Sequence, residues 1–152
     1  MGEADRLEVV RATGGTLGHI VYAGGIGVAF LLRYAVAPVT RLPAQQAQLL
    51  PLVIAVVAVT DYAVSLWLER MLLTGHGLKP SAQRFVRQMP MVPSLVCAAF
   101  GVSIAVYGAV LWLLGAGPRW WGLLVGLACV HWAHSFIRWS RREELPVDSA
   151  ER

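Results

Sequence analysis

The feature that most restricts the fold of this chain is a set of four apolar stretches separated by short polar segments. They cover residues about 17–36, 49–73, 92–114 and 120–139. A helix rises about 1.5 Å per residue, so roughly 20 residues cross the hydrocarbon core of a bilayer. The sequence therefore predicts an all-α, polytopic membrane protein, a four-transmembrane-helix bundle that forms a single membrane domain over residues 1–152.

Composition supports the same class. Hydrophobic residues make up 57% of the 152 residues and charged residues 14%, and the mean hydropathy is +0.58. A soluble domain of this length would leave much of that apolar surface in water. The net charge is +4, but the basic residues lie beside the apolar stretches and not together on a polar domain. We therefore expect the lipid bilayer as a partner, and no nucleic acid.

The placement of Arg and Lys predicts the orientation. One side of the membrane would carry ten basic residues: Arg6, Arg11, Arg70, Lys79, Arg84, Arg87, Arg138, Arg141, Arg142 and Arg152. The other would carry only Arg33, Arg41 and Arg119. Basic residues concentrate on the cytoplasmic side, so both termini are expected there. Twelve of the thirteen basic residues are Arg, a bias of GC-rich genomes that favours the cytoplasmic membrane of a bacterium.

Two polar segments on that side have their own character. The stretch from Pro80 to Gln88 places Phe85 and Val86 between Arg84 and Arg87, which predicts a short turn lying on the inner membrane surface against anionic lipid. The C-terminal segment, about 143–152, has too few apolar residues to pack and is expected to be mobile.

Small residues recur at four-residue spacing in three of the four stretches. The pairs are Gly14 and Gly18, Ala23 and Gly27, Gly101 and Ala105, and Gly122 and Gly126. Such pairs let helix backbones approach closely inside a membrane. Two interpretations stay open: packing within one bundle, or helix faces that bind another membrane protein.

Ionisable and hydroxyl side chains within the second stretch are candidate functional residues. Asp61 lies halfway along it, and Ser65 and Glu69 follow at four-residue intervals on the same helical face. A charged group at bilayer depth costs about 2.5–3.5 kcal/mol on insertion scales, so it needs a partner or a purpose. Glu69 is expected to reach water near the cytoplasmic boundary. For Asp61 the alternatives are a structural hydrogen bond to a neighbouring helix and a proton or ion pathway.

Histidines form the second candidate site. His131 and His134 share a broad face of the fourth stretch, and His19 lies at a similar depth on the first. If the first and fourth helices are neighbours, His19 with His134 or His131 could ligate haem b, or two histidines with a carboxylate could hold a transition metal. Purely structural histidines are the other interpretation. A weak internal similarity between the two helical hairpins would place Asp61 and His131 at equivalent depths.

Recognised catalytic motifs are absent from the sequence. It contains no His-Glu-x-x-His, no Gly-x-Ser-x-Gly, no phosphate-binding glycine loop and no Cys-x-x-Cys. Cys97 and Cys129 lie inside apolar stretches, which predicts small buried side chains and no disulfide across an outer loop. The leading hypothesis is a non-enzymatic accessory or assembly subunit of a bacterial membrane complex. The alternatives are a haem b-binding redox subunit and a proton or ion conduit centred on Asp61.

Overall fold

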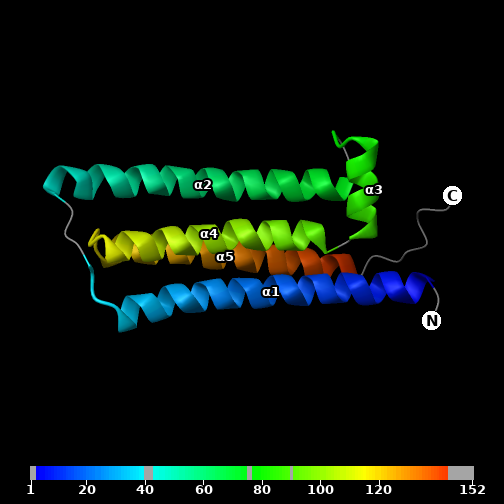
Figure 1. The fold of residues 1–152 in the computed structure, drawn as a ribbon, viewed down its shortest axis with the longest axis horizontal. Coiled ribbons are helices and arrows are strands. Elements are labelled where there is room, and N and C mark those ends of the chain that lie inside the picture. Colours follow the sequence, from blue (N-terminus) through cyan, green and yellow to red (C-terminus); the bar gives the residue numbers. More distant parts are fainter. Residues whose placement is uncertain (1–2, 40–42, 75–76, 90, 144–152) are drawn as a thin grey trace.

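A computed structural model of the chain describes residues 3–39, 43–74, 77–89 and 91–143 (Figure 1). These residues form five helices, α1 (Glu3–Ala35), α2 (Ala44–Thr74), α3 (Pro80–Gln88), α4 (Val92–Leu113) and α5 (Pro118–Glu143), and no strand. Four of them contain apolar spans long enough to cross a membrane: Gly15–Ala35, Gln48–Leu72, Val92–Leu113 and Pro118–Trp139. The predicted fold class, a helical-bundle membrane protein with several spans, is confirmed.

Three of these helices extend beyond the predicted stretches. Helix α1 begins at Glu3, α2 begins at Ala44, and α5 ends at Glu143. The reason is physical: an apolar stretch is needed only inside lipid, whereas a helix continues into polar sequence for as long as its backbone hydrogen bonds form. The predicted mobile tail lies, from residue 144 on, outside the described residues.

Helix α4 occupies the centre of the bundle. It packs against α1, α2 and α5, and Figure 1 shows α1 and α2 on opposite sides of the α4–α5 pair. In the most apolar 18-residue segment of α4, half of the residues are buried inside the protein, against 17% in the corresponding segment of α2. Gly115 and Gly117 have positive φ angles of 76° and 93° in the connection from α4 to α5, a conformation that glycine adopts without steric cost. This tight connection keeps α4 and α5 side by side.

Helix α3 lies crosswise at one end of the bundle, where α2 and α5 end (Figure 1). We call this the α3 end. The sequence predicted a short turn here, whereas the structure has a nine-residue helix with Arg84 and Phe85 exposed. Its strong separation of polar and apolar faces suits a helix that lies along a membrane surface.

Candidate functional site

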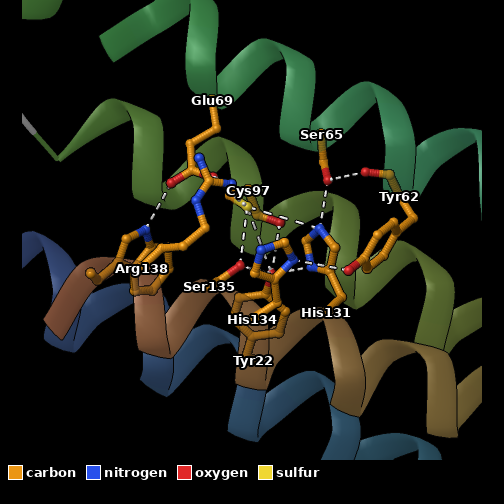
Figure 2. A network of polar contacts seen from close by, with 10 residues as sticks. Tyr22, Tyr62, Ser65, Glu69, Cys97, His131, His134, Ser135 and Arg138 are labelled. Atoms are coloured by element: carbon orange, nitrogen blue, oxygen red, sulfur yellow. Dashed lines mark hydrogen bonds and ion pairs between the residues drawn. The ribbon is translucent and has the colours of Figure 1, made fainter. Parts of the chain in front are cut away.

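Buried polar side chains from all four spans meet in the half of the bundle nearer the α3 end (Figure 2). We call this group the polar cluster. Its members are Tyr22 of α1, Ser65 and Glu69 of α2, Cys97 of α4, and His131, Ser135, Arg138 and Trp139 of α5. All are buried except Arg138, whose side chain is 26% exposed. Within the described residues, every buried side-chain nitrogen and oxygen has a hydrogen-bond partner.

Helical spacing explains how α2 and α5 contribute several members each. Ser65 and Glu69 are four residues apart, and Ser135 and Arg138 follow His131 by four and seven residues. Residues at these intervals lie above one another on one helix face. The two polar faces point at each other beside α4, so the cluster follows the helix axes for about two turns.

His131 is held through both ring nitrogens. Its Nδ1 is hydrogen-bonded to the Tyr22 hydroxyl, and its Nε2 lies 2.5 Å from Ser65 Oγ. The Ser65 hydroxyl donates to the Tyr62 carbonyl at 2.8 Å. Because the Ser65 hydroxyl gives its only proton to that carbonyl, we assign a proton to Nε2, which donates to Ser65. Both ring nitrogens of His131 are therefore engaged.

Tyr22 joins α1 to the other three spans. Its hydroxyl lies 3.1 Å from the Cys97 carbonyl oxygen and 3.4 Å from Ser135 Oγ, and the Cys97 thiol lies 3.3 Å from the same Ser135 oxygen. The ring fits against α4 because Gly101 has no side chain: a Cβ there would lie 2.0 Å from Tyr22 Cε1. One of the predicted small-residue pairs, Gly101 and Ala105, therefore serves packing within the bundle.

Glu69 is the fully buried carboxylate of the cluster. Its Oε2 forms an ion pair with Arg138 at 2.8 Å, and its Oε1 accepts a hydrogen bond from Trp139 Nε1 at 3.1 Å. The Cys97 thiol lies 3.8 Å from Oε2. The expectation that Glu69 reaches water is wrong, because its side chain is fully buried. Arg138 and Trp139 satisfy its carboxylate inside the protein instead.

Asp61 lies outside the polar cluster. Tyr107 of α4 donates a hydrogen bond of 2.8 Å to its Oδ2, so the carboxylate faces a neighbouring helix. Its side chain is partly exposed, in contrast to Glu69 on the same helix. The sequence placed Asp61 on one face with Ser65 and Glu69, but only the latter two meet α5.

The histidines predicted as haem ligands do not face each other. His19 accepts a hydrogen bond of 3.0 Å from Trp132 Nε1, and its ring packs on Phe136 and Trp139. His134 instead lies 3.0 Å from the Tyr62 hydroxyl of α2. The two rings therefore contact different sides of α5, so the pairing required for haem b does not fit. Across the described part of the chain, no three His, Cys, Asp or Glu side chains are placed to hold a metal ion.

Five members of the cluster were not among the candidate site residues taken from the sequence: Tyr22, Cys97, Ser135, Arg138 and Trp139. Tyr22 lies in an apolar stretch where a tyrosine can also pack as an ordinary aromatic residue. The available signal was its hydroxyl, which at that depth needs a hydrogen-bond partner. Arg138 was counted only for orientation, although an arginine at a helix end can turn inward toward a buried carboxylate.

Glycines in the spans divide into two groups. A Cβ at Gly18, Gly25, Gly101 or Gly108 would touch a neighbouring helix, whereas one at Gly24, Gly27, Gly122 or Gly126 would meet nothing within 4 Å. The second group includes both members of the predicted pair Gly122 and Gly126. That pair consequently lies on an outer surface of α5 and has no role in packing the bundle.

Chemically, the cluster is a series of proton donors and acceptors in contact: carboxylate, thiol, hydroxyls and imidazole. Such chains can pass a proton from group to group.

Comparison of the chain with protein-family models, with curated proteins and with solved structures finds no match in any of the three. The polar cluster and the surfaces around it are therefore the features from which the function can be inferred.

Proposed function

We propose that the protein is an accessory subunit of a bacterial membrane complex and that its polar cluster moves protons between the cytoplasmic surface and the middle of the bilayer. One observation carries this proposal. The contacts run from the Glu69 carboxylate, which is ion-paired with partly exposed Arg138, to the Cys97 thiol at 3.8 Å, from that thiol to the Tyr22 hydroxyl at 4.0 Å, and from there to His131. Inserting an ionisable group at this depth costs free energy, and such groups mark proton or ion pathways in many membrane proteins.

Orientation gives this path its direction. Among the described residues, nine basic residues belong to segments at the α3 end, including Arg70, Lys79 and Arg84, against two at the other end. Basic residues concentrate on the cytoplasmic side of a membrane. We infer that the α3 end is cytoplasmic, as are both termini. Arg138 then lies at the cytoplasmic boundary, and His131, seven residues earlier on α5, lies about 10 Å deeper at about 1.5 Å per residue.

The rest of the core supports an accessory role. Beyond His131 the buried residues facing one another are apolar, among them Ile26, Ala29, Ile104 and Leu124. This chain therefore offers, in its described residues, a polar path through only one half of the membrane. Any continuation of the route beyond His131, which is itself fully buried, has to come from outside the described polar residues of this chain, as expected for one subunit of a larger complex.

A second candidate is an assembly subunit in which the cluster only fixes how the helices pack. The complete pairing of its buried polar atoms favours this, because a satisfied polar network can specify a single packing arrangement. The two candidates predict different exchange behaviour. A proton path exchanges its protons with water while the bundle stays folded, whereas a structural network exchanges them only when the helices separate.

The thiol of Cys97 is a natural reporter, because it lies inside the path. In a Cys129→Ala variant it is the single thiol of the protein. After transfer of the reconstituted protein into deuterated buffer, infrared spectroscopy follows conversion of the S–H band to S–D. The proton-path proposal expects conversion within seconds. Conversion that takes hours, as slowly as the core amides exchange, would contradict it and favour the structural candidate.

A charge-neutral double variant, Glu69→Gln with Arg138→Gln, is the matched test of the route. It removes both charges together, so neither is left unpaired in the membrane. We expect the Cys97 thiol to exchange about tenfold more slowly or worse, which corresponds to a barrier increase of about 1.4 kcal/mol or more. Unchanged rapid exchange in a folded double variant would show that protons reach Cys97 by another route.

A further inference from the structure

A second polar feature, at the middle of the membrane, is not explained by the polar cluster. Asp61 lies halfway along the span Gln48–Leu72. Among the described residues, Tyr107 is the hydrogen-bond partner of its side chain, through Oδ2 alone. Because the side chain is partly exposed, its remaining hydrogen-bonding capacity is directed toward the outer surface of the bundle.

The surface around this carboxylate is mostly apolar. Val57 and Val64, four residues before and three residues after Asp61, are exposed on α2, and Val106 and Val110 are exposed beside Tyr107 on α4. Lipid tails offer no hydrogen bond to a carboxylate at this depth. An open acidic oxygen on an apolar, membrane-facing surface therefore needs a donor from outside this chain.

The geometry points to a docking face for one transmembrane helix of another membrane protein, which lies against α2 and α4 and places a lysine or arginine at mid-depth beside Asp61. Charge complementarity selects this occupant, because ionisable residues within membranes pair with one another. Helix α2 also has room for it, since only 17% of the residues in its most apolar segment are buried inside the bundle.

A second copy of this chain does not fit the same position. In the described spans, the lysines and arginines lie near the ends: Arg33 and Arg119 at one end, Arg70 and Arg138 at the other. A parallel copy thus brings no such cation to the depth of Asp61. Phospholipid headgroups do not fit either, because they remain at the membrane surface.

This inference deepens the accessory-subunit part of the proposed function and does not depend on the proton path. Asp61 is not a member of the polar cluster, and its recorded partner, Tyr107, is not a member either. Failure of the docking experiment would therefore leave the thiol-exchange result standing, and failure of thiol exchange would leave the docking result standing.

The test uses a designed probe: a leucine-rich transmembrane peptide with one central lysine, and the same peptide with leucine at that position. Energy transfer between labelled peptide and the labelled full-length chain in liposomes measures their association. We expect the lysine peptide to bind about tenfold more tightly than the leucine peptide. Asp61→Asn should abolish this preference, since it removes the charge and keeps the shape. Equal binding of the two peptides to the wild-type chain would overturn the inference.

Steric variants locate the face without changing any charge. Val57→Trp places a large side chain one turn from Asp61 and should block the lysine peptide. Val130→Trp is the matched control, because Val130 is similarly exposed but lies on α5. If both variants block binding equally, or neither does, the α2–α4 face is not where the peptide docks. In the Cys129→Ala background, an unreactive Cys97 thiol in each variant confirms that the bundle remains folded, since this thiol is fully buried in the native chain.

Discussion

Replacing Gly101 with alanine should be one of the most damaging small changes in this protein. The added Cβ would lie 2.0 Å from Tyr22 Cε1 and 2.8 Å from its hydroxyl oxygen. The Tyr22 ring is fully buried, and its hydroxyl contacts the Cys97 carbonyl, His131 and Ser135. The ring therefore has to move out of the space that the new methyl group occupies, and it breaks these hydrogen bonds when it does so.

The size of the effect follows from three contributions. Forcing a methyl group into a packed core costs about 1–3 kcal/mol. Leaving a buried hydrogen-bond partner unsatisfied costs about 1–3 kcal/mol more. The better helix propensity of alanine returns roughly 1 kcal/mol. We therefore expect Gly101→Ala to lower the free energy of unfolding by about 3 kcal/mol, on the order of 10 °C in Tm for a chain of this length.

Thermal unfolding in detergent can be followed with a fluorogenic thiol reagent in the Cys129→Ala background, where only Cys97 reports. Gly126→Ala is the matched control, because a Cβ there meets nothing within 4 Å. The control should be neutral or slightly stabilised. Combining Gly101→Ala with Tyr22→Leu should cost little more than Tyr22→Leu alone, because the clash needs both groups. Equal melting of Gly101→Ala and the Gly126→Ala control would refute the reasoning.

Three further predictions concern the buried ion pair, the membrane topology and haem binding. Arg138→Ala leaves the buried Glu69 carboxylate without its cation and should lower the free energy of unfolding by about 3–5 kcal/mol. The double variant Glu69→Gln with Arg138→Gln should lower it less, because it leaves no buried charge unpaired. The same melting assay measures both. Single cysteines at Gln46 and Gly117 should react with an impermeant thiol reagent outside intact cells, and one at Gly77 should not; the opposite pattern would invert the proposed orientation. Protein purified from haem-replete cells should show no Soret band, because the described histidines His19, His131 and His134 are each hydrogen-bonded to other side chains and do not face one another. A haem spectrum would contradict that geometry.

The sequence by itself was sufficient for the membrane class and the positions of the spans. This succeeds because insertion into lipid depends on length and apolarity, which are local properties of each stretch. Local periodicity also placed Ser65 and Glu69 on one face of α2, and both lie in the polar cluster. Helix ends were predicted less well, because polar residues continued α1, α2 and α5 beyond the apolar stretches.

Only the tertiary structure decided which polar groups meet. Helices α1 and α5 are neighbours, as the haem hypothesis required, but the rotation of α5 turns His134 toward α2 and leaves Trp132 for His19. A rotation of this kind is set by packing around central α4, where Gly101 admits the Tyr22 ring. Such pairings depend on side-chain shapes from several helices at once, so the spacing of residues along one helix cannot determine them.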